Sequence, residues 1–339
     1  MNVPQSSLDY SHFPVMLKEV IEICSPKNGG YFVDCTFGGG NYSKEILKFS
    51  NTKVVALDRD KNVIKKAQKI KSLYKDRFIF FNEKFSSLEK VLINSNNKPD
   101  TIIFDLGVSS LQLLDMSRGF SFKSKAKLDM SMGLSNLSAE EVINNYDEHD
   151  LKLIIKIFGD EKEASKIAKN IIKARKEKKI STVTELVKII EKSKKKNYNK
   201  KINICTKTFQ ALRIFVNKET TELIEGIIQA TKLIKAGGKI IIISFHSIED
   251  KIVKFYFSNF SKDKSKSSRY FPENTDNEFI FFENYGNQFL KPSNEEIKIN
   301  PPSRSAKLRF VTRNKQKFNY PKNLKFKFKN YLNLESTNV

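Results

Sequence analysis

The sequence has few cysteines, no long hydrophobic run and no segment typical of export. The three cysteines, Cys24, Cys35 and Cys205, are scattered and include no CxxC pair. This odd number argues against a disulfide framework and against a zinc site, and it suits a reducing compartment. No apolar run approaches the roughly 18 residues of a transmembrane helix, and residues 1–17 lack the basic and apolar regions of a secretory signal. We therefore expect a cytoplasmic protein without a membrane partner.

Arginine is also scarce, although the chain is strongly basic. Its 61 Lys and Arg face 38 Asp and Glu, which gives a formal net charge of +23 over 339 residues. A polyanion, most simply nucleic acid, is the partner that such a charge favours. Only nine of the basic residues are arginine and 52 are lysine, so a compositional preference for lysine explains the charge equally well. The 27 phenylalanines and 39% hydrophobic residues suffice for a large core and exclude general disorder.

Short β-branched or aromatic runs alternate with helical patterns at both ends of the chain. The expected strands are residues 31–35, 53–57, 78–82, 101–106, 239–244 and 306–312. Strand–helix alternation at this spacing predicts right-handed βαβ units and a parallel sheet. The continuous apolar run KIIIIS at 239–244 suits a buried central strand. The expected fold class is therefore α/β, with a Rossmann-like, parallel-type sheet.

The alternation breaks in the middle of the chain, where only helical periodicity is visible. We predict that residues 113–205 form an all-helical insertion, and that residues 1–112 and 206–313 together form one discontinuous α/β domain. Residues 314–339 are basic and aromatic. Two interpretations of this tail stay open: disorder, and an arm that contacts nucleic acid.

A glycine-rich turn and an acid lie at the ends of the first two expected strands. The turn is DCTFGGGNYS at 34–43, and Asp58 ends the second strand, twenty residues after Gly38. Glycines let the backbone approach a ligand closely, and a carboxylate at this spacing accepts hydrogen bonds from a ribose diol. The pair predicts a site for a dinucleotide or for S-adenosylmethionine. The alternative is a glycine-rich connection without a ligand, with Asp58 as a helix N-cap.

The end of the fourth expected strand also carries polar side chains. It runs into FDLGVSSLQ at 104–112, which in a doubly wound sheet lies beside the ligand crevice. Asp105 could contact a cofactor or an acceptor amine, and Ser109 and Gln112 supply neutral donors and acceptors. The alternative is a polar strand-end loop without a ligand.

The fifth expected strand runs into SFHSIED at 244–250. This position places His246 at the same edge of the sheet, where a titratable side chain is a candidate for catalysis. Ser247 with Asp250 also has the pattern of a capping box for the following helix. A catalytic and a structural interpretation of this segment are therefore both open.

Two other segments have the composition of a nucleic-acid contact. In RGFSF, Phe120 beside Arg118 could stack on a base, or it could pack in the core, as Phe does more often. In RSAKLR at 304–309, Arg304 and Arg309 have the fork geometry that suits phosphate oxygens. A solvated turn before an edge strand is the alternative there.

Taken together, these segments resemble the bacterial family that methylates the N4 amine of a cytidine in small-subunit (16S) ribosomal RNA. The likeness runs from HFPVMLKEV at 12–20 to RSAKLRF at 304–310, and the blocks between are DLGVSS, RGFSF, LDM, FQALRIFVNKE and SFHSIED. The resemblance implies a class I methyltransferase sheet interrupted by a helical substrate-recognition domain. It also implies S-adenosylmethionine as the cofactor and ribosomal RNA as the partner.

The resemblance further assigns roles to residues of this chain. The cofactor would contact the glycine loop, the acid after the second strand, an aromatic ring after the third and the loop after the fourth. Together with Gly38, these positions are Gly40, Asn41, Tyr42, Asp58, Phe85, Asp105 and Gln112. Asp58 would hold the ribose hydroxyls, and Phe85 would pack near the adenine.

Three positions depart from the family pattern. The glycine loop usually ends Gly-Gly-His-Ser, whereas this chain has GNYS at 40–43. Asn tolerates the positive φ of such a turn, and Tyr42 in place of His argues against an acid–base role there. KAK at 125–127 stands where Asp-Gly-Pro is usual, and Ser131 replaces an Arg.

The implied reaction is in-line displacement of the sulfonium methyl by the cytosine N4 nitrogen. Because that lone pair is delocalised into the ring, acceptors aimed at the amine hydrogens would activate it. We expect Asp105 to do so with help from Ser109, and His246 to orient the base or take the released proton. The base must leave its stack to react. The chemistry requires no metal. The expected RNA contacts are Arg118, Phe120, Phe245, Arg304 and Arg309.

Three other function classes explain parts of the sequence. An RNA-binding assembly factor without catalysis explains the charge and the aromatic loops, but not the glycine loop paired with Asp58. A nicotinamide-dependent oxidoreductase explains that pair, but not the basic insertion or DLGVSS. A methyltransferase of DNA or protein shares the cofactor and differs only in the acceptor. Free RNA and an assembled or nearly assembled subunit both stay open as substrates, as do a monomer and a homodimer.

Overall fold

The chain divides into two compact units in the computed structural model, which describes residues 14–93, 95, 97–194, 203–261, 279–283 and 285–337. Unit 1 comprises Met1–Leu111 and Gln229–Asn319, and unit 2 comprises Gln112–Ile228 and Tyr320–Val339. The chain therefore leaves unit 1 for unit 2, returns to unit 1, and ends in unit 2.

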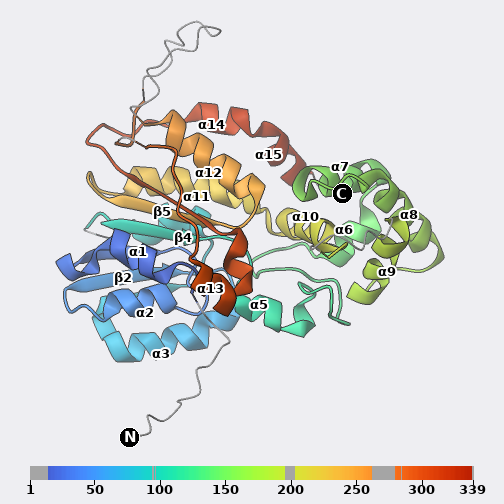
Figure 1. The fold of residues 1–339 in the computed structure, drawn as a ribbon, viewed down its shortest axis with the longest axis horizontal. Coiled ribbons are helices and arrows are strands. Elements are labelled where there is room, and N and C mark those ends of the chain that lie inside the picture. Colours follow the sequence, from blue (N-terminus) through green and yellow to red (C-terminus); the bar gives the residue numbers. More distant parts are fainter. Residues whose placement is uncertain are drawn as a thin grey trace, which may run out of the picture. The chain divides into compact units, whose positions relative to one another are not determined.

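Unit 1 is built around a six-stranded sheet (Figure 1) with the order β3-β2-β1-β4-β5-β6. The strands are β1 (Gly30–Asp34), β2 (Thr52–Leu57), β3 (Phe78–Phe81), β4 (Thr101–Asp105), β5 (Lys239–Ser244) and β6 (Lys307–Thr312). The first five are parallel, and β6 is antiparallel to β5. The predicted α/β class with a Rossmann-like sheet is confirmed. Because the strand order reverses between β1 and β4, a ligand is expected at the carboxyl ends of these two strands.

All six strands lie within one residue of their predicted bounds. The edge strands β3 and β6 expose Ile79 and Phe310, whereas the inner strands are more fully buried. In β5, residues Ile240 to Ile243 are each 0% exposed, as expected for a central strand covered on both faces. The helices of unit 1 are α1 (Leu17–Cys24), α2 (Asn41–Leu47), α3 (Ile64–Tyr74), α4 (Leu88–Leu92), α12 (Ser247–Asn259) and α13 (Asn294–Ile299).

The regular elements among the described residues of unit 2 are helices, apart from an isolated bridge between Lys127 and Thr182. Its helices are α6 (Ala139–Asn145), α7 (Glu148–Gly159), α8 (Ala164–Glu177), α9 (Val183–Ser193), α10 (Thr206–Asn217), α14 (Lys322–Lys327) and α15 (Lys329–Glu335). Full capping boxes begin α6, from Ser138 to Glu141, and α9, from Thr182 to Glu185. Two helices, α5 (Ser110–Leu114) and α11 (Glu219–Leu233), span the boundaries between the units.

The compact units differ from the predicted domains at their edges. Unit 2 contains Gln112, α10 and the first part of α11 in addition to the predicted insertion, and it also contains residues 320–339. α10 belongs there because it packs extensively against α7. The sequence shows where strands stop and resume, but not which hydrophobic core an intervening helix joins.

The C-terminal tail contains two short helices within residues 320–337. It forms α14 and α15, shown in red in Figure 1. Leu324 and Phe328 anchor these helices, since both side chains are buried.

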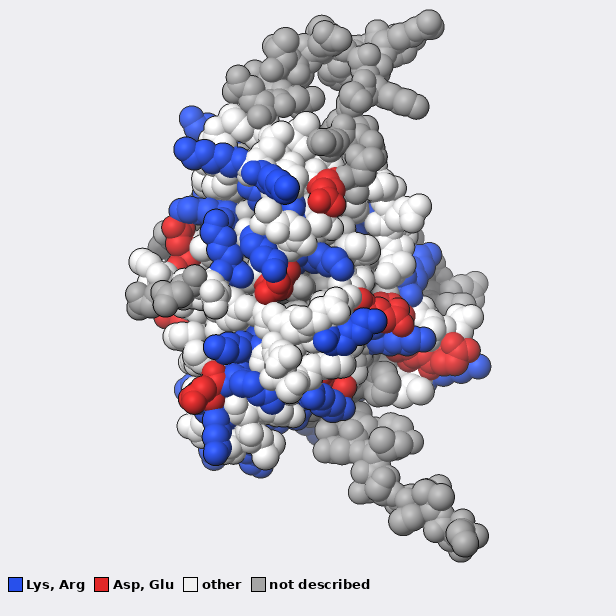
Figure 2. Space-filling view, turned by 90° about the vertical axis from the view of Figure 1, so that its left-hand side faces the viewer, with Lys and Arg blue, Asp and Glu red and all other residues white. Residues whose placement is uncertain are grey.

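Basic side chains are spread widely over the surface. Figure 2 shows one face, on which Lys and Arg occur in several places with fewer Asp and Glu among them. This spread suits a general abundance of lysine as well as a polyanionic partner. Among the described residues, no helix combines the length and the apolar composition that crossing a membrane requires.

Candidate functional site

Three carboxylates meet at the carboxyl ends of neighbouring strands in unit 1. Asp34 ends β1, Asp105 ends β4, and Asp58 directly follows β2. In the sheet register, Asp34 is level with Ala56 of β2 and with Ile103 of β4. The sheet therefore brings the predicted cofactor acid, Asp58, and the predicted catalytic acid, Asp105, to one edge.

Asp58 is bonded directly to the glycine loop. Its Oδ2 accepts a hydrogen bond from the backbone N–H of Gly38 at 2.7 Å, and its Oδ1 accepts one from Asp60 at 2.8 Å. Burial raises the pKa of Asp58 to about 6. Each carboxylate oxygen has further acceptor capacity, so Asp58 can still accept hydrogen bonds from ribose hydroxyls.

The glycines at this edge serve two different purposes. A Cβ on Gly38 would meet no atom closer than 3.9 Å, and one on Gly107 would approach only the Phe245 ring, at 3.6 Å. A Cβ on Gly40 would lie 2.6 Å from the Phe37 ring, and its φ of 72° is left-handed. The backbone conformation favours glycine at all three positions, because Gly38 and Gly107 also have a positive φ, of 50° and 91°. Packing excludes a side chain only at Gly40, so the backbone at Gly38 and Gly107 stays accessible to a ligand.

Asp105 is held from two sides and keeps one oxygen without a partner. Its backbone N–H donates to Thr36 Oγ1 at 2.7 Å. The Tyr42 hydroxyl donates to the carbonyl oxygen of Val15 at 2.5 Å and lies 3.3 Å from Oδ2 of Asp105. The other carboxylate oxygen, Oδ1, is buried and has no hydrogen-bond partner among the residues that the structure describes. A buried acceptor in this state is unusual, and it is suited to a donor on a bound ligand.

The pKa of Asp105 lies far above the usual value of an aspartate. Burial raises its pKa to about 8, the Tyr42 hydroxyl lowers it, and the neighbouring carboxylates of Asp34, Glu249 and Glu296 raise it. In the free protein, Asp105 is therefore largely protonated at neutral pH. A hydrogen-bond donor or a positive charge brought to Oδ1 would favour the carboxylate.

Tyr42 contacts Asp105 through its hydroxyl, while its ring lies in the core. Its side chain is 3% exposed and belongs to the hydrophobic core of unit 1, and the predicted contact with a cofactor stays a prediction. Only its hydroxyl reaches the site, between Val15 and Asp105. The sequence signal for this arrangement is the departure from His at this position, although the link to Val15 is not visible in the sequence.

Asp34 is a structural acid that the sequence analysis does not single out. It is 0% exposed, and it accepts hydrogen bonds from Ser43 Oγ at 2.7 Å and from the Thr36 N–H at 3.3 Å. Burial raises its pKa to about 6. Asp34 therefore ties the start of α2 to the end of β1 and fixes the glycine loop between them.

The remaining predicted cofactor residues of unit 1 also lie at the strand ends. Phe85 begins η4 (Phe85–Ser87) after β3, and its ring meets Phe104 of β4 edge-on at 5.4 Å. Asn41 is the first residue of α2 and Ser109 directly precedes α5; both are partly buried. These positions agree with the predicted ones, and their contacts with a cofactor stay a prediction.

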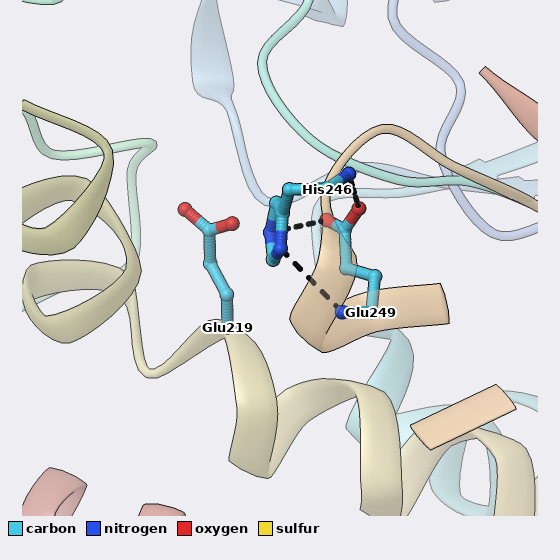
Figure 3. Close-up of side chains that lie close together, drawn as sticks. All are labelled: Glu219, His246 and Glu249. Carbon is cyan, nitrogen blue, oxygen red and sulfur yellow. Dashed lines mark hydrogen bonds and ion pairs between the residues drawn. The ribbon is translucent and has the colours of Figure 1, made fainter. Parts of the chain in front are cut away.

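His246 caps α12 in the structure (Figure 3). Its Nδ1 accepts a hydrogen bond from the backbone N–H of Glu249 at 3.4 Å, while Glu249 Oε2 accepts from the N–H groups of Phe245 and His246. The capping box is thus formed by His246 and Glu249, and the predicted pair of Ser247 and Asp250 is wrong. The helix begins one residue earlier than the sequence pattern suggested.

The second ring nitrogen of His246 is also close to Glu249. Nε2 lies 3.0 Å from Glu249 Oε1, but at an angle that forms no hydrogen bond with it. The structure therefore shows His246 as the N-cap of α12, and its role in orienting the base or accepting the proton stays a prediction.

Arg309 is placed in the interior, against the prediction that it binds phosphate. It is 3% exposed, its Nε donates to Asp250 at 2.7 Å, and its Nη1 donates to the Tyr285 hydroxyl at 2.6 Å. Lys307 shares the Asp250 carboxylate. The antiparallel pairing of β6 with β5 turns these side chains towards α12, which the sequence does not reveal. Arg304 is exposed on η7 (Pro301–Ser305) and stays a candidate for phosphate.

Three predicted site residues belong to unit 2. Gln112 and Phe120 are 5% and 7% exposed. Arg118 lies over the Phe120 ring at 5.4 Å and donates to the carbonyl oxygen of Ser131 at 2.8 Å. The Phe120 ring therefore packs inside its unit, which was the alternative to stacking on a base.

The chain is similar to known methyltransferases over most of its length. The family model described as the MraW methylase family matches residues 9–314. Ribosomal RNA small subunit methyltransferase H of Ehrlichia canis (strain Jake) is 43% identical over 302 residues, which are 88% of this chain and 99% of that protein. The protein of the same name from Rickettsia massiliae (strain Mtu5) is 42% identical over 301 residues, with coverages of 88% and 97%. An rRNA methylase structure from Streptococcus thermophilus aligns with 87% of this chain and 96% of its own, but its TM-score of 0.39 at 10% identity supports no argument.

Proposed function

Because the chain belongs to the MraW methylase family, we propose that it transfers a methyl group from S-adenosylmethionine to the N4 amine of a cytidine in small-subunit (16S) ribosomal RNA. The names of the relatives from Ehrlichia and Rickettsia support the ribosomal acceptor. One observation carries the proposal for this chain. The unpartnered oxygen of Asp105 lies at the same sheet edge as the glycine loop that is bonded to Asp58.

The residues at this edge fit S-adenosylmethionine. Asp58 offers carboxylate oxygens to the ribose, Phe85 offers a partly buried ring to the adenine, and Gly38 and Gly107 border space that a side chain would fill. We therefore assign cofactor binding to the glycine loop, Asp58, Phe85 and the loop after β4. When bound, S-adenosylmethionine supplies an electrophilic methyl group on its sulfonium.

Asp105 is the residue that we assign to the acceptor amine. Its Oδ1 is positioned by the bond from the Asp105 N–H to Thr36 and by the contact of Oδ2 with Tyr42. A carboxylate that accepts a hydrogen bond from the amine raises the electron density on N4 and stabilises the positive charge that develops there. Asp105 is also our candidate acceptor for the proton that the product amine must lose.

We assign His246 and Phe245 different roles. His246 is a positioning residue in this proposal, because its capping of α12 fixes the turn that follows β5. Phe245 is partly exposed and lies over Gly107, so it replaces the buried Phe120 as the ring that stacks on the target base. Ser109 supplies a neutral hydroxyl in the loop after β4.

The proposal is tested with labelled S-adenosylmethionine and two forms of the substrate. Assembled small subunits and naked 16S ribosomal RNA, both from a source that lacks the modification, are incubated with the protein, and transfer to RNA is counted. We propose the assembled or nearly assembled subunit as the better substrate. Sedimentation of the same preparation distinguishes a monomer from the homodimer.

The outcomes separate the competing function classes. Transfer to RNA supports the proposal, and the ratio of the two rates identifies the substrate form. Tight binding of S-adenosylmethionine with transfer only to DNA or protein would show that the protein is a methyltransferase whose acceptor is not RNA. Absence of both binding and transfer would favour a non-catalytic assembly factor.

A further inference from the structure

The C-terminal segment of unit 2 separates its side chains into a buried and an exposed set. The buried members are apolar except for one acid: Leu324, Phe328, Leu334 and Glu335. The exposed members are neutral polar residues (Asn323, Asn330, Asn333 and Ser336) and a basic and aromatic set: Tyr320, Lys322, Phe326, Lys327 and Lys329. Such a division is typical of a segment that is fixed on one side and presents the other to solvent.

Specific polar contacts fix the buried side to the rest of unit 2. The Glu335 carboxylate, 1% exposed, accepts hydrogen bonds from the backbone N–H of Thr220 at 3.0 Å and of Thr221 at 2.7 Å at the start of α11. Lys325 pairs with Glu225 at 2.5 Å. The contact of α15 with α7 includes the Tyr331 and Phe158 rings, whose centroids are 6.1 Å apart.

The exposed side has an unusual composition. Glu335 is the only acid in residues 320–337 and it is buried, so lysines alone supply the charge of this surface. Phe326 is 72% exposed and Tyr320 is 41% exposed. The Lys329 ammonium lies 4.8 Å from the centre of the Phe326 ring. Phenylalanine is rarely left in water to this extent, and lysines around exposed rings are typical of surfaces that bind single-stranded nucleic acid.

The segment lies outside the part of the chain that the methylase family model matches, which ends at residue 314. The chemistry at the sheet edge therefore does not call for it. An additional surface of this kind would act on substrate affinity and leave the reaction itself unchanged.

We propose that the surface formed by Tyr320, Lys322, Phe326, Lys327 and Lys329 is an accessory RNA-binding surface. The lysines contact phosphates, and the Phe326 ring stacks on an unpaired base. This inference rests on the proposed function, because ribosomal RNA is the polyanion that the enzyme would encounter. It assigns the tail to the second of the two interpretations that the sequence left open.

The test compares two triple variants of the full-length protein. In the first, Lys322, Lys327 and Lys329 are each changed to Gln. In the matched control, Lys65, Lys69 and Lys71, which are exposed on α3 in unit 1, are changed in the same way. Phe326→Ser is a third variant that removes the ring and keeps the charge. Thermal unfolding verifies that each exposed substitution leaves the fold intact.

Binding to naked 16S ribosomal RNA is measured at several salt concentrations, together with kcat and KM for methyl transfer. The tail variant should lose roughly tenfold to a hundredfold in affinity near 0.15 M salt. Its log–log salt slope should fall by about 2. KM for RNA should rise by a similar factor while kcat and binding of S-adenosylmethionine stay unchanged. Phe326→Ser should weaken binding with little change in the slope.

An equal loss of RNA affinity in the α3 control would overturn the inference, because it would show that any three lysines contribute equally, wherever they lie on the protein. Unchanged RNA affinity in the tail variant would also overturn it and would point to a protein partner for this surface. Failure of the proposed function is seen separately, as absence of methyl transfer to RNA by the unmodified protein.

Discussion

Asp105 is the residue on which the proposed chemistry depends most. Within the described part of the chain, its Oδ1 is buried without a hydrogen-bond partner, while backbone and hydroxyl contacts fix the rest of the residue. Asp105→Asn keeps the shape and removes the charge, so we expect kcat to fall by roughly a hundredfold to a thousandfold. Methyl transfer to small subunits measures this loss.

The same amide substitution at an exposed acid is the control for Asp105→Asn. Asp76 is exposed on η3 (Lys75–Arg77), and Asp76→Asn should transfer methyl at the unmodified rate. Near-normal turnover by Asp105→Asn, with a folded protein, would remove this residue from the mechanism.

Tyr42 sets the pH at which Asp105 becomes a carboxylate. The pKa of Asp105 is about 8, raised by burial and lowered by the Tyr42 hydroxyl. Because only the carboxylate can activate the amine, kcat/KM for S-adenosylmethionine should increase as pH rises through about 8. Tyr42→Phe removes the contact that favours the charged form of Asp105. The pH at which kcat/KM increases should therefore become higher.

The pH profiles of the unmodified enzyme and of Tyr42→Phe provide this comparison directly. A purely structural tyrosine would change the height of the profile and not its position. If kcat/KM increases at the same pH in both enzymes, the link between Tyr42 and Asp105 is contradicted.

His246 can be tested with a substitution that keeps its cap. Asn is a good N-cap residue, so His246→Asn should preserve the start of α12 while it removes the imidazole. Since the structure shows His246 as the N-cap of α12 through Nδ1, we expect kcat to fall by less than about tenfold. A loss beyond about a hundredfold in a folded variant would restore the catalytic role that the sequence suggested.

At the scale of elements, contacts between segments that are distant in the chain could not be predicted from the sequence. The antiparallel register sets Ser244 opposite Lys307 and Ile242 opposite Arg309. That register explains why Asp250 binds Lys307 and also Arg309, which the sequence analysis assigned to phosphate. Local patterns such as capping boxes are visible in the sequence, but a partner about sixty residues away is not.

Removal of the Glu335 side chain, which anchors α15, should destabilise the protein measurably. The carboxylate satisfies the N–H groups of Thr220 and Thr221 at the start of α11. Glu335→Ala leaves these groups without that acceptor, so we expect the free energy of unfolding to fall by about 1–3 kcal/mol. Hydrogen exchange of the two amides should become faster.

The exposed neighbour Asn333 in the same helix provides the control, and Asn333→Ala should leave the exchange of both amides unchanged. Equal protection of the amides in Glu335→Ala and in the unmodified protein would show that Glu335 does not anchor the tail.

At the scale of the whole molecule, the sequence predicts the frame better than the site. The strands follow from apolar runs, of which that of β5 is buried on both faces. The spacing of Gly38 and Asp58 predicts a ligand site at the ends of the first two strands, but not the hydrogen bond between these two residues. The contact of Tyr42 with Val15 and Asp105 could not be predicted, because it depends on how α2 packs against the segment before α1. The burial of Phe120 depends likewise on the packing of a whole unit.

The most direct test of the account is to locate the transferred methyl group. Small subunits that lack the modification are incubated with the protein and S-adenosylmethionine that carries a deuterated methyl group. The RNA is then digested to nucleosides and analysed by mass spectrometry. We predict that the label appears in N4-methylated cytidine and is lost with Asp105→Asn. Label on a ring carbon, on a ribose hydroxyl or in protein would contradict the assignment of Asp105 to an acceptor amine.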